Sequence, residues 1–227
     1  MSDFLPILAY QKIGVAPKKS CLKNEWTSLR RLKKMLTWLT QHHYTFITPA
    51  DLSKKRPAKP VLLAFFGGYQ SFYTDVFPLL QAHQICATLF VAVETLGTYN
   101  RWQDPNEEPW QNIVTPKQLT QMFKSGRVQI GTLGLDGHPL LEEEPTWAQQ
   151  NVKESIYRLE KLYKIETCAL GFWPNSAWNE GRARHLTRGL NLPVVTSQKG
   201  FNPRIENPFL RVLNPGLFTR FLLWKNQ

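Results

Sequence analysis

Side chains that could bind a metal ion or activate water are few in this 227-residue chain. Asp136 and His138 lie two residues apart in a predicted loop and could offer two ligands. A catalytic zinc site takes three protein ligands, so this pair alone does not predict a metal centre. His42 and His43 are adjacent at the end of a predicted helix, where neighbouring side chains diverge, so a shared metal is not expected there either.

The cysteines argue against both a disulfide framework and a cysteine metal site. Cys21, Cys86 and Cys168 are odd in number, far apart and free of any CxxC spacing. Cys86 falls in an apolar run and is interpreted as a small core residue.

Tryptophans in predicted loops are candidates for binding. Trp102 and Trp110 belong to the long polar segment 97–111, and exposed loops with tryptophan often bind ligands. The alternative is that these rings simply cap the core.

The net charge of +11 raises the question of an anionic partner. The basic residues are scattered, and no helix-turn-helix, zinc-finger or aromatic RNA-binding pattern accompanies them, so nucleic acid is an unlikely ligand class. A generally basic solvated surface explains the charge as well. No apolar run could span a bilayer and no signal peptide is visible, so a cytoplasmic location is expected, or an extracytoplasmic one if the sequence is trimmed.

The elements that must position these residues follow from the segment 60–73. An apolar run, 60–66, ends at the glycine pair Gly67-Gly68, which is typical of a buried strand that stops at a tight turn. A new element follows, and 85–93 is a second run of strand length. Strand, crossover and strand predict a βαβ unit and a parallel sheet. Functional sites of such sheets usually lie at the carboxyl ends of the strands.

The remaining elements alternate in the same way. Helices are expected over 24–42, from Pro116 to 124, over 147–163 and over 182–188. Strands are expected over 5–10, 44–48, 128–131, 168–172, 193–196 and 209–213. The chain, 1–227, is therefore predicted to be one α/β domain.

The segment 65–69, Phe-Phe-Gly-Gly-Tyr, resembles the first motif of the polysaccharide deacetylases (the NodB-homology domain, carbohydrate esterase family 4), which normally reads Thr-Phe-Asp-Asp-Gly-Tyr. Fragments at 59–63, 77–80, 87–90, 115–119, 124–131 and 172–174 fit in the same order. The resemblance covers the chain from Leu8 to Val212. It implies a distorted (β/α) barrel of about seven strands.

The resemblance also implies a chemistry that this chain lacks the residues to perform. In the family, one aspartate is the base, a second binds a divalent metal, and two later histidines complete the metal site. Here the base position is Phe66, the metal aspartate position is Gly67, and the first histidine position is Leu133. His138, with Asp136 beside it, fits only the second histidine, so no metal and no other cofactor is predicted.

Residues that could bind a sugar remain at several family positions. The third motif reads Phe172-Trp173-Pro174-Asn175, where Trp173 could stack on a sugar and Asn175 could bond a hydroxyl. Tyr69 of the first motif, Trp102, Trp110, Asp136 and His138 complete the candidate binding residues. Plain barrel packing is the alternative for Trp173, and a backbone-bonded loop histidine is the alternative for His138.

These residues lead to the hypothesis of a pseudoenzyme. The chain is expected to bind an amino-sugar polysaccharide or oligosaccharide, or a protein partner of glycan synthesis, in bacterial surface-polysaccharide metabolism. The alternatives are a carbohydrate N-deacetylase with a rearranged site and a basic interaction module for an anionic partner.

Overall fold

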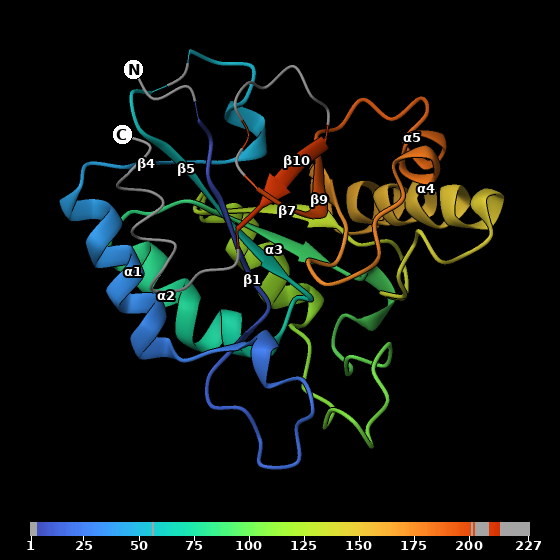
Figure 1. Ribbon diagram of the computed structural model, residues 1–227, viewed down its shortest axis with the longest axis horizontal. Coiled ribbons are helices and arrows are strands. Elements are labelled where there is room, and N and C mark those ends of the chain that lie inside the picture. Colours follow the sequence, from blue (N-terminus) through green and yellow to red (C-terminus); the bar gives the residue numbers. More distant parts are fainter. Residues whose placement is uncertain (1–3, 56, 201, 203–208, 214–227) are drawn as a thin grey trace.

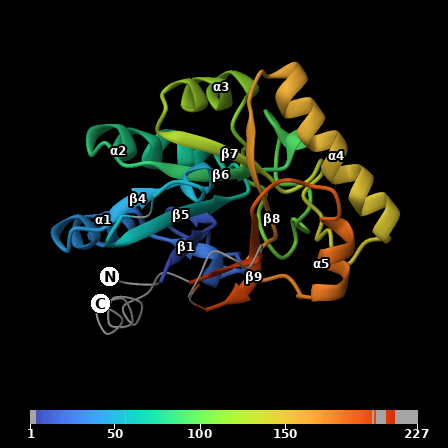
Figure 2. The same cartoon turned by 90° about the horizontal axis from the view of Figure 1, so that it is seen from above.

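The computed structural model describes residues 4–55, 57–200, 202 and 209–213. Seven parallel strands form a nearly closed barrel (Figure 1, Figure 2). In spatial order they are β1 (Ile7–Tyr10), β5 (Pro60–Phe66), β6 (Ala87–Val91), β7 (Val128–Thr132), β8 (Thr167–Gly171), β9 (Val194–Lys199) and β10 (Phe209–Val212). A parallel bridge between Leu8 and Leu213 brings the two edges together. The predicted barrel of about seven strands is confirmed.

Five α-helices among the described residues lie around the outside of the barrel (Figure 2). They are α1 (Leu29–Gln41), α2 (Phe77–Ala82), α3 (Pro116–Lys124), α4 (Pro145–Leu162) and α5 (Glu180–Leu186). Strand β4 (Thr45–Ile47) adds to β5, while β2 (Lys12–Ile13) and β3 (Trp26–Thr27) form a separate pair. Single turns are η1 (Lys23–Glu25), η2 (Pro49–Asp51) and η4 (Val93–Thr95), and η3 (Phe72–Val76) is a π-helical turn. In the described residues no helix is long and apolar enough to cross a membrane.

Helix boundaries follow the capping residues. Thr115 accepts from the backbone N–H of Gln118, whose side chain accepts from Thr115 N–H in return, and Pro116 occupies the first turn. The predicted start of α3 is therefore confirmed. The prediction of a helix from residue 24 was wrong at that end: α1 begins after Ser28, whose hydroxyl accepts from Arg31 N–H.

The barrel separates two apolar layers. Residues that alternate along each strand point inward or outward, because successive side chains of a strand face opposite sides. Ile7, Leu62 and Phe66 belong to the inner cluster, with Leu133. Leu8, Leu63 and other outward-facing residues pack with the helices in the larger cluster. This division places Phe66 inside the barrel.

Candidate ligand-binding site at the barrel mouth

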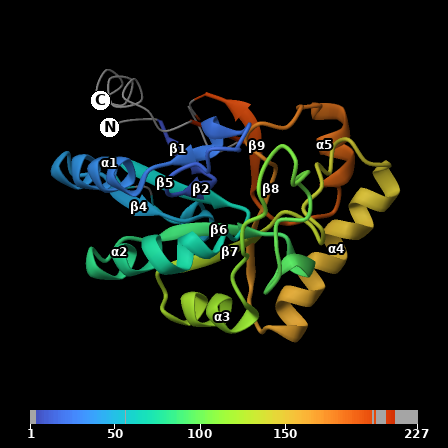
Figure 3. The ribbon, with the colours of Figure 1, turned by 90° about the horizontal axis from the view of Figure 1, so that it is seen from below.

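The carboxyl ends of the parallel strands meet at one end of the barrel, here called the mouth. In Figure 1 the segments that follow β1 and β6 both lie on the lower side of the molecule, and Figure 3 shows that side. The segments after β5, β7 and β8 carry the remaining candidate residues. The fold therefore gathers the predicted residues at one end, as expected for a parallel barrel.

Phe66 is buried in the barrel interior. Its ring is 1% exposed and stacks on Phe90, with ring centroids 4.8 Å apart and planes 11° apart. The Phe90 ring in turn occupies the space beside Gly131 and Gly171, where an added Cβ would lie 2.4 and 2.6 Å from it. Two aromatic rings thus fill the interior at the level where the resemblance places the catalytic base.

Gly67 has a backbone conformation that an aspartate would rarely adopt. Its φ is +103°, in the region that favours glycine. A Cβ built on Gly67 would lie 2.4 Å from Cε2 of Tyr69, so the tyrosine ring occupies the space of any side chain there. The position that the resemblance assigns to the metal aspartate is therefore closed both by backbone geometry and by a neighbouring ring.

The second half of the predicted site is split between the interior and the surface. Leu133 is 1% exposed and belongs to the same apolar cluster as Phe66. His138 and Asp136 lie in the loop beyond it with half-exposed side chains, His138 Nδ1 standing 3.2 Å from Asp136 Oδ2. Asp136 Oδ1 also accepts from the backbone N–H of His138. In the described part of the chain, no three His, Cys, Asp or Glu side chains are placed to share a metal ion.

The aromatic candidates form two groups. Trp173 donates its indole N–H to the carbonyl of Gly137, 2.8 Å away, and packs against Trp102 with ring centroids 5.2 Å apart. Trp110 is 46% exposed and lies parallel to Tyr99. The predicted residue Asn175 is exposed in the loop after Trp173. Trp102 and Trp173 are half-buried and pack against each other, so part of the surface of each ring stays exposed.

A buried charge cluster beside the mouth had no counterpart in the sequence-based predictions. The ammonium of Lys12, 1% exposed, lies 2.8 Å from Glu25 Oε2 and 3.1 Å from Glu108 Oε1. Glu108 also accepts from the Trp26 indole, 2.9 Å away, and from the Ser20 hydroxyl. The only available signal was a lysine inside the apolar run 5–13, because its partners are 13 and 96 residues away (25 − 12 and 108 − 12).

The cluster fixes the ionisation of its members. Burial alone would raise the pKa of Glu108, but hydrogen bonds from Ser20 and Trp26 and the charge of Lys12 bring its pKa below the usual value. Burial and the charges of Glu25 and Glu108 raise the pKa of Tyr69 well above its usual range. Glu108 is therefore an anion and Tyr69 a neutral phenol near neutral pH.

Comparison with known proteins identifies the family. The sequence profile described as "Polysaccharide deacetylase" matches residues 53–195, which is more than half of the chain. The chain belongs to the polysaccharide deacetylase family. The predicted resemblance to this family is thereby confirmed.

Relatives and solved structures agree with this assignment. The poly-beta-1,6-N-acetyl-D-glucosamine N-deacetylase of Staphylococcus epidermidis is 24% identical over 241 aligned positions, covering 99% of this chain and 78% of that protein. The Streptococcus pyogenes deacetylase PplD superposes with a TM-score of 0.78 at 21% identity, with 99% and 98% of the two chains covered. IcaB from Ammonifex degensii gives 0.77 at 18% identity, with 99% and 97% covered. At these identities the structures show the shared fold.

The residues at the mouth do not fit the divalent metal that the family implies. Phe66 and Leu133 carry no donor atom, and Gly67 carries no side chain. Asp136 and His138 contribute two donors at most, and Asp136 is engaged by His138. Three protein ligands are the usual minimum for a catalytic site, so this donor set falls short.

Proposed function

We propose that this polysaccharide deacetylase family member binds an amino-sugar glycan at the barrel mouth without deacetylating it. The role fits bacterial surface-polysaccharide metabolism, with the glycan itself or a protein partner of glycan synthesis as the ligand. The observation that carries the proposal is the filled interior: Phe66 stacks on Phe90 where a base would stand, and Tyr69 closes the space beside Gly67.

The absence of a base at this position removes a chemical step. Amide hydrolysis requires a group that takes a proton from the attacking water, and an aromatic hydrocarbon ring cannot accept one. The neighbouring polar pair, Asp136 and His138, is half-exposed and lies in a loop rather than at a strand end. Trp102 and Trp173 still present aromatic surface beside the mouth, which supports sugar binding.

The test measures binding and chemistry in one sample. The protein is titrated with a β-1,6-linked N-acetylglucosamine pentamer by calorimetry in the presence of a divalent metal, and released acetate is assayed afterwards. We expect heat of binding and no acetate above the buffer control. Acetate that increases with protein concentration, and that disappears with His138→Ala, would establish the rearranged enzyme instead. No binding of any amino-sugar oligomer would overturn the proposal.

A second candidate function is the binding of an anionic partner through helix α1. Arg30, Arg31, Lys33 and Lys34 are exposed in its first two turns, and the first turn holds no acidic residue. None of the four has an acidic partner among the described residues. Cations near a helix N-terminus oppose the helix dipole, so an anionic partner would stabilise them.

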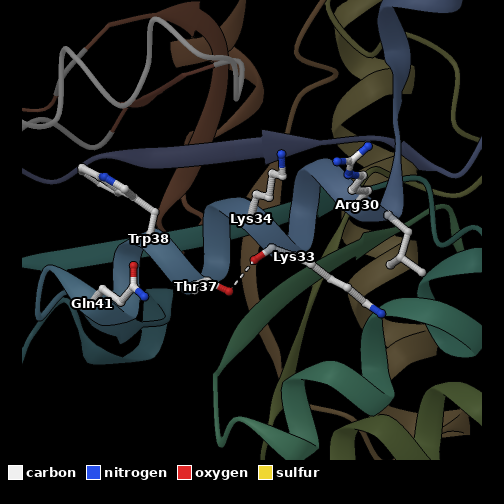
Figure 4. A pocket seen from close by; sticks show the side chains of 7 residues that line it. Arg30, Lys33, Lys34, Thr37, Trp38 and Gln41 are labelled. Atoms are coloured by element: carbon white, nitrogen blue, oxygen red, sulfur yellow. Dashed lines mark hydrogen bonds between the residues drawn. The ribbon is translucent and has the colours of Figure 1, made fainter.

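The shape of this surface agrees with such a partner. Arg30, Lys33 and Lys34 project from α1 around a hollow of about 610 Å³ that also includes Trp38 (Figure 4).

Binding to heparin should weaken as the salt concentration rises. The double variant Arg30→Glu, Lys34→Glu should reduce the slope of log affinity against log salt concentration by about 2, one for each lost contact with an anionic group. The matched control reverses two exposed lysines of α4, Lys153 and Lys161. Equal loss from both pairs would show that only net charge matters.

A further inference from the structure

A second hollow lies beside the barrel mouth and is distinct from the filled interior. It has a volume of about 150 Å³. Its walls include Lys12 and Trp26 from the β2–β3 pair, Tyr69, Gln70 and Ser71 from the turn after β5, and Asn112 from the segment before α3. The ring of Tyr69, which lines this cavity, also fills the space beside Gly67.

The rim of the cavity carries three polar side chains that are exposed or half-exposed. Gln70, Ser71 and Asn112 make no side-chain hydrogen bond to any described residue. Their backbone is nevertheless fixed: Gln70 N–H donates to the Asn112 carbonyl at 2.8 Å, and Tyr69 bridges Ile113. Two amides and a hydroxyl on a fixed backbone are donors and acceptors prepared for a polar ligand.

The cavity wall is aromatic and held in place. Trp26 is fixed through its N–H to Glu108, 2.9 Å away. The ammonium of Lys12 lies 5.9 Å from the centre of the Trp26 ring and 5.6 Å from that of Tyr69. A polar rim over a rigid aromatic wall suits a ring that has hydroxyls at its edge and an apolar face.

We propose that this cavity binds one sugar unit of the glycan, in its N-acetylated form. The inference rests on the proposed function and gives it a site outside the family's metal position. The hollow is partly open, and its volume of about 150 Å³ takes part of one sugar unit while the rest of that unit stays outside. The polymer must therefore present one unit, at an end or a bend, to this hollow.

The preference for the acetylated form follows from the charges. Among the described residues that line the cavity, Lys12 is the only charged group and none carries a carboxylate. Glu25 and Glu108 lie behind Lys12 and accept from it, from Gln103 and from Trp26. A free ammonium would lose its water without gaining a carboxylate partner, whereas an acetamido group pairs with neutral amides.

The test compares N,N′-diacetylchitobiose with chitobiose, its free-amine counterpart, by calorimetry. Gln70→Ala combined with Asn112→Ala should weaken binding of the acetylated sugar at least tenfold. Gln81→Ala, an exposed glutamine of α2 remote from the cavity, is the matched control and should have no effect. Wild type should bind the acetylated disaccharide at least tenfold more tightly than the free amine. Thermal melts of each variant exclude loss of folding.

A gain-of-function variant tests the role of charge in this preference without relying on a loss of binding, which unfolding could also cause. Asn112→Asp places a carboxylate on the rim and should raise the affinity for chitobiose relative to the acetylated sugar. Loss of binding in Trp173→Ala but not in the double variant would overturn the cavity and leave glycan binding at the mouth intact. Equal affinities for the two disaccharides in wild type would overturn the stated preference. Absence of binding to both, and to the pentamer, would overturn the proposed function itself.

Discussion

At the scale of single residues, neighbouring rings fill the space around the two positions that the resemblance assigns to the base and to a metal ligand. Phe66 meets the ring of Phe90, and the side-chain space of Gly67 is taken by Tyr69. The identities at 66 and 67 could be read from the sequence, but the rings that complete them could not. Phe90 lies in β6 and Gly171 in β8, with β7 between them in the sheet. Only the closed barrel brings Gly171 against the ring of Phe90.

Replacing Gly67 with alanine should destabilise the protein through two separable causes. The positive φ alone costs about 1 kcal/mol for an L-residue. The clash with Tyr69 should add about 2 kcal/mol, as overpacking does. Gly126→Ala is the control, because Gly126 also has a positive φ, +70°, and no described neighbour lies within 4 Å of a Cβ added there. Urea unfolding gives the free energies of both variants.

The source of the extra cost is tested by removing the ring. In a Tyr69→Ala background, Gly67→Ala should cost no more than Gly126→Ala does in the same background. A Gly67→Ala penalty that persists without the tyrosine ring would show that the backbone alone closes this position.

Truncating Phe66 should leave a cavity inside the barrel. Phe66→Ala is expected to lower the free energy of unfolding by about 3–5 kcal/mol, because a fully buried ring loses its contacts. Tyr157→Ala is the comparison, since that ring is 55% exposed on α4 and should change stability little. Similar losses in the two variants would contradict tight packing around Phe66.

At the scale of elements, the sequence predicted correctly those helix boundaries that are determined by neighbouring residues. Thr115, Pro116 and Gln118 fix the start of α3 within four residues of sequence, so the sequence predicted it correctly. The start of α1 was predicted too early, because Trp26 and Thr27 pair with β2 instead of continuing the helix. That pairing depends on residues 14 positions away (26 − 12), which helical periodicity cannot reveal.

The Lys12 cluster shows the same limit for the site. It joins β2, η1 and the segment 97–111 through Lys12, Glu25 and Glu108. Lys12 and Trp26, which donates to Glu108, also line the new cavity. A scattered lysine and two glutamates give no pattern in sequence. Their role arises from burial, which makes pairing obligatory.

Glu108→Gln should reduce stability in a pH-dependent way. The folded-state pKa of Glu108 lies below its unfolded value, so its contribution is present above the unfolded pKa of about 4.5. It is lost as the pH falls through the folded pKa. The variant should be about 3 kcal/mol less stable at pH 7, because removing one charge of a buried pair leaves Lys12 undercompensated. Urea midpoints between pH 3 and 7 measure the difference, which should shrink at the acid end.

At the scale of the whole molecule, the fold was predictable because its signal is distributed. Several short fragments in the family's order, together with alternating strand and helix patterns, indicated the barrel. A functional site lacks this redundancy, since it depends on a few side chains and their neighbours. Fold alone therefore leaves open whether a deacetylase barrel deacetylates.

The net charge of +11 is a property of the whole molecule. It favours association with anions in general, whereas the cavity beside Tyr69 is suited to an uncharged ring. The two properties are separable by salt, because ionic contacts weaken as salt rises and neutral hydrogen bonding does so far less. Glycan binding should thus persist at salt concentrations that abolish heparin binding.

A metal titration of the untagged protein tests whether the barrel mouth can hold an ion. Zinc, cobalt and nickel are titrated by calorimetry into protein that has been dialysed against chelator. We expect no stoichiometric binding, because the positions of Phe66, Gly67 and Leu133 supply no ligand and the pair Asp136–His138 supplies two at most. One ion bound per chain, with loss of that binding in His138→Ala, would contradict this expectation.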